Sequence, residues 1–214
     1  MSNREKVLIK ICHDVLNSYE NPESPNFSFV GKRINEGMYD EFLNAVETQY
    51  IVSDLSDLNY SSCLDWTITS RQDEKNRYGV SLSLVGRYAV AQRYKSGRYL
   101  SHQSPDISSE DLPLITLFQQ HNIILLDGFV LNSKLPVKIE DGDFTEETQS
   151  CVYNLLFERD ELIQANGETI RHLSRVPQVL ETDAPHGFSL AASGLGAYLD
   201  VPAKVLAEYK NDLN

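Results

Sequence analysis

A short polar segment near the C-terminus contains the three side-chain types that a hydrolase combines in a catalytic triad. Asp183 and His186 lie three residues apart, and Ser189 and Ser193 follow them. An acid can orient a histidine, which then acts as a base towards a serine nucleophile. Triad members need not be neighbours in the chain, and the G-x-S-x-G elbow that presents many serine nucleophiles is absent. We therefore expect a polar loop here, with a hydrolase site as the alternative.

An acidic segment is the second candidate, and it consists of Glu140, Asp141, Asp143, Glu146 and Glu147. It lacks the D-x-[DN]-x-[DN]-G order of an EF-hand loop, so calcium binding is not predicted. Acidic residues stabilise the first turn of a helix, because the helix dipole places partial positive charge there. The same residues can instead form an acidic patch that binds a basic protein. Both interpretations stay open.

Four Arg-Tyr pairs are the third candidate, and they are Arg77-Tyr78, Arg87-Tyr88, Arg93-Tyr94 and Arg98-Tyr99. Residues 71–98 contain seven basic and two acidic side chains and so carry +5, whereas the whole chain carries −12. Strand alternation predicts tyrosines against the core with solvated hydroxyls, and Arg77, Arg87 and Arg93 pointing into solvent. Tyrosine and arginine are also enriched at interface hot spots. Arg77, Arg87, Arg93 and Tyr94 are therefore candidate partner-binding residues.

The overall charge and the scattered cysteines exclude several classes of protein. A net charge of −12 is unfavourable for general nucleic-acid binding and favourable for association with a basic protein. No apolar run approaches the roughly 18 residues of a membrane span, and the first residues do not fit a signal peptide. No zinc-ligand spacing and no phosphate-binding loop is present, so we expect no metal and no cofactor. Cys12, Cys63 and Cys151 are odd in number and far apart, which indicates a reducing, cytoplasmic location.

Periodic apolar residues predict helices on both sides of a central sheet. The predicted helices cover residues 4–19, 37–49, 109–121, 145–158 and 201–212. Ser109 is the predicted cap of the third, and Asp143 with Glu146 the capping box of the fourth. Residues 27–30 are predicted to form a short strand or an anchoring loop, and residues 123–126 a buried strand or an apolar connector.

Alternation of apolar and polar residues predicts an antiparallel meander over about 63–100. Leu64, Trp66 and Ile68 alternate with polar residues, and the same pattern recurs over 78–84 and 88–94. No linker divides the chain, so residues 1–214 are predicted to form a single α+β domain with helices from both termini against a central antiparallel sheet.

Three segments carry a likeness to known proteins: YGVSLSLVGRY (78–88), IILLD (123–127) and VYNLLF (152–157). Over residues 64–157 the layout resembles the small cytoplasmic α+β immunity proteins that are partners of bacterial toxins. The resemblance implies an acidic, non-enzymatic inhibitor that occludes a basic cleft by surface complementarity, and it assigns no role to an individual residue. The alternatives are the hydrolase and an accessory subunit that contacts a larger assembly through its Arg-Tyr face.

Overall fold

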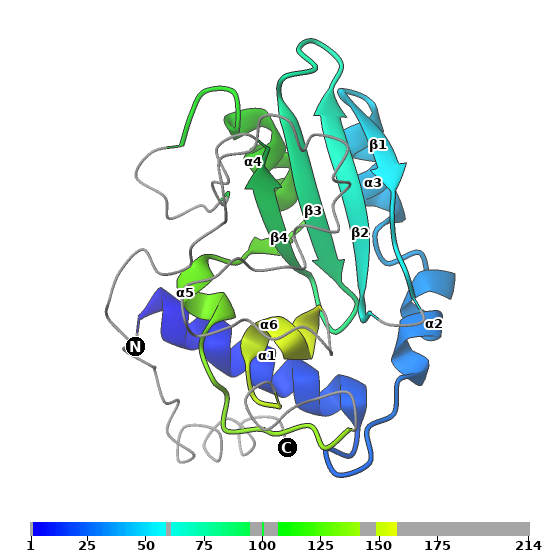
Figure 1. Cartoon of the computed structure of the whole chain (residues 1–214), viewed down its shortest axis with the longest axis vertical. Helices are drawn as coiled ribbons and strands as arrows, with labels where there is room; N and C mark the ends of the chain where they lie inside the picture. The colour runs from blue at the N-terminus through cyan, green and yellow to red at the C-terminus, as the bar shows by residue number, and fades with distance from the viewer. Residues whose placement is uncertain (1, 59–60, 95–99, 101–106, 142–148, 158–214) are drawn as a thin grey trace.

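The chain folds as an α+β structure around a five-stranded, mostly antiparallel sheet (Figure 1). The computed structural model describes residues 2–58, 61–94, 100, 107–141 and 149–157. The helices are α1 (Asn3–Tyr19), α2 (Ser28–Asn35), α3 (Asp40–Glu47), α4 (Leu112–Gln120), α5 (Gly128–Leu131) and α6 (Val152–Leu156). The strands are β1 (Tyr50–Asp54), β2 (Cys63–Ser70), β3 (Arg77–Ser83), β4 (Tyr88–Arg93) and β5 (Ile124–Leu125). The predicted fold class is thereby confirmed.

Helix α1 forms where the apolar spacing predicted a helix over 4–19. Its buried residues are Leu8, Ile9, Ile11, Cys12, Val15, Ser18 and Tyr19. At its start, the Ser2 side chain accepts the backbone N–H of Glu5 while the Glu5 carboxylate accepts the N–H of Ser2, which completes a capping box. Near its end, the Tyr19 hydroxyl donates to the carbonyl oxygen of Leu155 at 2.8 Å, so a buried hydrogen bond joins α1 to α6.

Strands β1 to β4 form an antiparallel meander in chain order, and β5 then pairs with β4 in parallel. The meander predicted over about 63–100 accounts for β2, β3 and β4, whereas β1 was not predicted. Trp66 lies opposite Val80 on one side and Asp54 on the other. Residues 123–126 contain β5, so the strand interpretation of that apolar run is confirmed.

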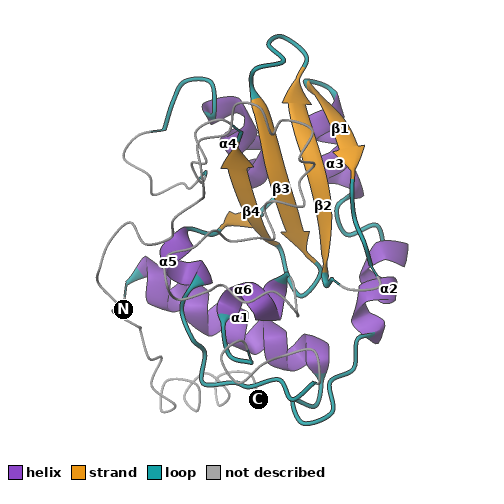
Figure 2. Cartoon of the chain, viewed as in Figure 1, coloured by secondary structure: helices purple, strands orange, loops and turns teal. Residues whose placement is uncertain are grey.

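Helices α3 and α4 cover one face of the sheet, and α1, α5 and α6 lie at one end of it (Figure 2). Phe42 of α3 stacks on Trp66 of β2 with ring centroids 6.2 Å apart, and it contacts Phe118 of α4 with centroids 4.8 Å apart. Aromatic pairs at these distances add to the stabilisation from burial. The side of β2 that carries Trp66 is therefore the side that faces α3.

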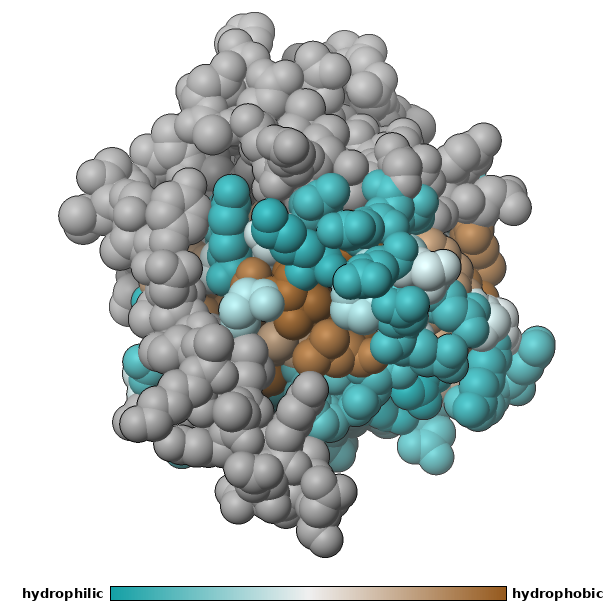
Figure 3. All heavy atoms as spheres, turned by 90° about the horizontal axis from the view of Figure 1, so that it is seen from below, coloured by the Kyte–Doolittle hydropathy of each residue, from teal (hydrophilic) through white to brown (hydrophobic). Residues whose placement is uncertain are grey.

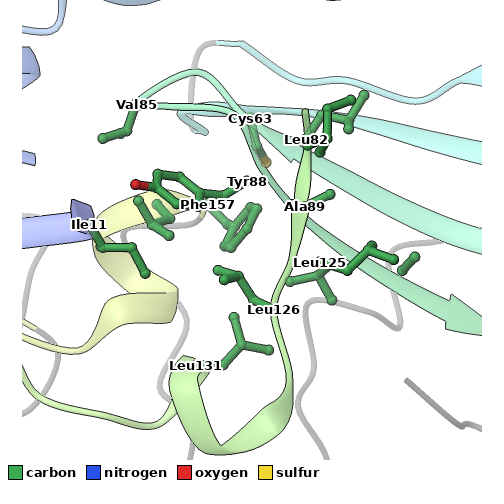
Figure 4. Close-up of a cluster of buried hydrophobic side chains, with 14 of the residues drawn as sticks. Ile11, Cys63, Leu82, Val85, Tyr88, Ala89, Leu125, Leu126, Leu131 and Phe157 are labelled. Atoms are coloured by element: carbon green, nitrogen blue, oxygen red, sulfur yellow. The ribbon is translucent and has the colours of Figure 1, made fainter. Parts of the chain in front are cut away.

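A further part of the core lies where α1, α5 and α6 meet the start of β4 (Figure 4). Ile11, Tyr88, Leu126, Leu131 and Phe157 come together there from segments far apart in the sequence, and each is fully or almost fully buried. Seen from below, the described surface of the molecule is mainly hydrophilic, with a hydrophobic area near its centre (Figure 3).

The predictions for the starts of α2 and α4 are wrong. Residues 27–30 belong to the start of α2 instead of a strand or loop, and the Asn26 side chain accepts the N–H of Ser28 at 2.9 Å just before it. The helix predicted over 109–121 begins at Leu112. Its N-terminal turn is held by Ser108, whose hydroxyl donates to the Asp111 carboxylate at 2.7 Å, so Ser109 is not the cap.

Of the helix predicted over 145–158, the structure describes only α6, whose N-cap is Cys151. Residues 149–151 before it are not helical, so the predicted start is wrong. The proposed capping residues Asp143 and Glu146, and the helix predicted over 201–212, lie outside the residues that the structure describes. Within the described ranges, no helix combines the length and the apolar character that crossing a bilayer requires.

Candidate functional site

Arg93 lies in an internal ion-pair network instead of pointing into solvent. Its side chain is 21% exposed, and its guanidinium contacts Glu110 and, at 3.4 Å, the buried carboxylate of Asp111. The Tyr78 hydroxyl donates to the same carboxylate at 3.0 Å. Burial lowers the pKa of Arg93, but the hydrogen bond to Glu110 and the charge of Asp111 outweigh it and raise the pKa overall. The prediction of a solvated Arg93 is wrong, because the turn before α4 brings two carboxylates to the end of β4.

The other two arginines of the predicted row also make contacts within the molecule. The Arg77 guanidinium carbon lies 5.1 Å from the centroid of the Tyr94 ring, which is a cation–π contact. Arg87 is exposed, yet its guanidinium donates to the carbonyl oxygens of Met38 and His121, each at 3.1 Å. Arg87 therefore joins the segment before α3 to the end of α4, and the three arginines do not present a row of free charges.

The hydroxyls of Tyr78 and Tyr88, which were predicted to be solvated, are hydrogen-bonded inside the protein. Tyr88 is fully buried, and its hydroxyl donates to the Asp14 carboxylate of α1 at 2.7 Å. Lys10 forms an ion pair with that carboxylate at 2.5 Å and lies 5.0 Å from the centroid of the Tyr88 ring. Burial first, and the hydrogen bond to Asp14 second, raise the pKa of Tyr88. Tyr88 therefore stays protonated and serves the packing of α1 against β4.

Most of the other predicted site residues lie outside the part of the chain that the structure describes. These are Asp143, Glu146, Glu147, Asp183, His186, Ser189 and Ser193. Within the acidic segment, Glu140 is exposed and its N–H donates to the carbonyl oxygen of Pro22 at 2.7 Å, while Asp141 is half-buried. The triad and the acidic patch at these positions remain predictions.

A longer acidic region lies in residues 34–70, which contain α3, β1 and β2. Between Arg33 and Arg71 the sequence has no lysine, arginine or histidine. Its seven acidic residues are Glu36, Asp40, Glu41, Glu47, Asp54, Asp57 and Asp65. All of these except Asp65 are exposed. This long gap between basic residues was readable in the sequence, but none of the predicted sites used it.

Part of this acidity has a structural explanation and part does not. Asp40 and Glu41 occupy the first turn of α3, where the helix dipole favours negative charge. Glu47 occupies the last turn, where the dipole disfavours it, and Asp54 ends the strand β1. Neither Glu47 nor Asp54 forms an ion pair with any residue in the described ranges. The Asp54 carboxylate accepts hydrogen bonds from the backbone N–H and the hydroxyl of Ser56, so it also holds the turn after β1. The Arg71 guanidinium donates to the backbone carbonyl oxygen of Glu47. Both carboxylates are nevertheless exposed and can attract a positively charged partner.

Exposed apolar side chains concentrate in the same region. The exposed large hydrophobic residues of the described ranges are Ile34, Ile51, Leu55, Leu58 and Leu112. Four of these five lie within residues 34–58, so they share a short stretch of chain with most of the acidic residues. A protein–protein interface commonly has an apolar centre and a polar rim. We define the acidic edge surface as the side chains of Glu47, Ile51, Asp54, Leu55, Asp57 and Leu58.

The position of β1 brings this surface to the edge of the sheet (Figure 1). Strand β1 pairs with β2 and is the first strand in the order of the sheet. Two residues, 48–49, connect Glu47 to the start of β1, so the end of α3 and the edge strand stay close together. Beyond the strand, the N–H of Leu55 donates to the carbonyl oxygen of Asp65 at 2.8 Å and holds the chain against β2.

The described residues contain no group of three or more histidine, cysteine, aspartate or glutamate side chains placed to hold a metal ion. Cys12, Cys63 and Cys151 are buried thiols. Burial raises the pKa of Cys151, which keeps its thiol protonated and unreactive.

Comparison with known proteins identifies no relative of this chain: no family model, no curated protein sequence and no solved structure matches it. The resemblance to immunity proteins therefore stays a prediction. A function can be inferred from the chemistry of the acidic edge surface itself.

Proposed function

We propose that this protein is a non-enzymatic, cytoplasmic protein-binding protein, most concretely an immunity-type inhibitor that occludes a basic cleft of a bacterial toxin. The observation that carries the proposal is the acidic edge surface. There, exposed carboxylates and exposed apolar side chains occur together in a stretch of 37 residues, 34–70, that contains no basic residue. This observation supports a binding surface at α3 and β1 instead of one formed by the Arg-Tyr pairs.

The two kinds of side chain make different contributions to binding. The apolar residues Ile51, Leu55 and Leu58 lose water on association, which supplies affinity at about 25 cal/mol per Å² of buried apolar area. The carboxylates of Glu47 and Asp54 attract a positively charged partner and accelerate the encounter, more strongly at low ionic strength. A basic active-site cleft, such as that of an enzyme that acts on nucleic acid, has the complementary charge.

The described residues provide no observation in favour of the two alternatives. An accessory subunit that binds through its Arg-Tyr face needs available arginines, and Arg93 is neutralised by Asp111 and Glu110. The hydrolase depends on Asp183, His186 and a serine, which lie outside the described ranges.

The test compares two double variants that change the net charge equally. The binding partner is captured from the host on the immobilised protein, purified, and its association rate is measured as a function of salt. Glu47→Lys with Asp54→Lys should slow association at low salt by at least about tenfold. Glu20→Lys with Glu23→Lys is the matched control: both residues are exposed, lie at and just after the end of α1 outside both acidic regions, and should leave the rate nearly unchanged.

Two results would overturn the proposal. Equal effects of the two double variants would show that net charge matters and that the acidic edge surface does not. Inhibition that requires turnover by this protein would contradict a non-enzymatic role.

A further inference from the structure

The outer edge of β1 presents backbone groups that the sheet leaves unpaired. In an antiparallel pair, successive residues alternate between facing the neighbouring strand and facing away from it. The N–H of Leu55 donates to Asp65 of the β2 side, so the odd-numbered residues of β1 face β2. The N–H and C=O groups of Val52 and Asp54 therefore point away from the sheet. Among the described residues, no backbone hydrogen bond other than those of the β-sheet involves Val52 or Asp54.

This edge lacks most of the features that usually prevent another strand from adding to a sheet. Proteins protect exposed edges with proline, lysine, bulges or a covering element. Residues 34–70 contain neither proline nor lysine, and β1 pairs with β2 over five consecutive residues without a bulge. Ile51 is 48% exposed and Leu55 38% exposed, so apolar surface accompanies the open edge.

The two faces of the edge differ in chemistry. Cross-strand neighbours share a face of the sheet, and Asp54 is the neighbour of Trp66, whose ring stacks on Phe42 of α3. Asp54 therefore lies on the α3 face. Ile51 and Leu55 have the opposite parity and lie on the other face. The exposed carboxylate of Asp54 thus lies on the α3 face, which it shares with the half-buried Val52. The exposed apolar side chains of Ile51 and Leu55 lie on the other face.

We propose that an extended segment of the protein partner adds to β1 as a further strand, and that this segment alternates basic and apolar residues. The inference rests on the proposed function and specifies how the partner binds. The main chain of the segment pairs with the free groups of Val52 and Asp54. Its apolar side chains cover Ile51 and Leu55, and its lysines or arginines lie beside Asp54 on the α3 face. Strand addition of this kind derives affinity from the backbone and specificity from alternate side chains.

Charge argues against a second copy of this chain as the occupant. Pairing two β1 edges would bring together two segments that each carry seven acidic and no basic residues. Like charges at a contact cost free energy, whereas a basic segment gains from the same field.

The experiment selects displayed ten-residue peptides on the full-length protein and measures the binding of the best synthetic peptides. Val52→Pro removes the outward N–H, and proline is tolerated on edge strands at such positions. Val52→Ala also loses the valine side chain but keeps the N–H, which makes it the matched control. The selected peptides should alternate basic and apolar residues. They should bind Val52→Ala close to normally, and bind Val52→Pro at least about tenfold more weakly, the equivalent of one hydrogen bond to the backbone.

A second measurement guards against misfolding of the proline variant. Peptides of identical sequence that are N-methylated at alternate residues cannot donate to the edge, and they should lose binding to the unmodified protein. Hydrogen exchange of the Val52 and Asp54 amides should slow when the unmodified peptide is bound.

Each other outcome overturns strand addition. These outcomes are the absence of selected peptides, peptides without the alternating basic pattern, N-methylated peptides that bind normally, and self-association that Val52→Pro abolishes. If the purified partner binds Val52→Pro normally but binds Glu47→Lys with Asp54→Lys slowly, strand addition fails while the proposed function stands. If neither variant alters binding of the partner, both fail.

Discussion

The Tyr78 hydroxyl donates a hydrogen bond to Oδ1 of Asp111 at 3.0 Å, and the Arg93 guanidinium lies 3.4 Å from the same oxygen. Asp111 is 1% exposed, so this carboxylate is buried at the junction between the sheet and α4. A buried charge is stable only where it is paired and hydrogen-bonded. Asp111 therefore pairs with the charge of Arg93, which the sequence analysis had proposed as available for binding a partner.

We expect Asp111→Ala to lower the free energy of unfolding by about 3 kcal/mol, because it leaves Arg93 and Tyr78 without their shared acceptor. Tyr78→Phe removes one hydrogen bond and should cost about 1 kcal/mol. Urea denaturation monitored by circular dichroism measures both. Glu110→Gln is the control: its side chain is 52% exposed, so the loss should stay below about 1 kcal/mol. Similar losses for Glu110 and Asp111 would contradict the distinction between the exposed and the buried pair.

Two glycine-to-alanine substitutions should change stability in opposite directions. A Cβ atom at Gly86 would lie 2.6 Å from a ring carbon of Tyr88 and 2.8 Å from Oδ2 of Asp14, so Gly86→Ala should destabilise by about 1–3 kcal/mol. At Gly31 in α2, no atom lies within 4 Å of the added Cβ. Gly31→Ala should stabilise by about 0.5–1 kcal/mol, because alanine restricts the unfolded chain. Thermal unfolding measures both, and a stabilising Gly86→Ala would refute the packing around Tyr88.

Stability should fall steeply above about pH 10. Burial is the main cause that raises the pKa of Tyr39, Tyr78 and Tyr88 above the ordinary value of 10.0. A tyrosine with a raised pKa in the folded state contributes stability below pH 10, and this is lost as the unfolded chain ionises at higher pH. Each such tyrosine lowers the free energy of unfolding by up to about 1.4 kcal/mol for each pH unit above pH 10.

The measurement combines urea denaturation between about pH 8 and about pH 11 with the ultraviolet absorbance of tyrosinate. The buried tyrosines should ionise together with unfolding, and Tyr88→Phe should reduce the slope of stability against pH. Full ionisation of all tyrosines near pH 10 in the folded protein would contradict their burial.

The local patterns predicted the elements whose apolar residues repeat regularly. The spacing in residues 4–19 predicted α1, and alternation predicted β2, β3 and β4 with little error. Strand β1 was missed, because Tyr50–Asp54 holds only five residues and begins with three consecutive apolar ones, so the sequence does not show the alternation that its burial does. Its strand conformation depends on pairing with β2, which is a contact between separate segments.

The candidate site was less predictable than the fold. The Arg-Tyr pairs attracted interest because of their charge, and the structure gives Arg93 two carboxylates from the α4 side and Arg87 two carbonyl oxygens. These partners lie far from the arginines in the sequence, so the pattern of residues around each arginine could not predict them. The acidic edge surface depends on the missing basic residues over 34–70, a sequence property, and on the exposure of Ile51 and Leu55, a structural one.

Amino-acid order alone sets the charge of each segment and the period of its apolar residues, because both are properties of neighbours in the chain. From these follow the α+β class, the first helix and the central strands. Which charges are neutralised, and which strand edge stays open, depends on contacts across more than ten residues, as between Arg93 and Asp111. Such contacts form only when the chain packs. The candidate binding surface inferred from the sequence therefore included the arginines, whereas the one inferred from the tertiary structure is the acidic edge of β1.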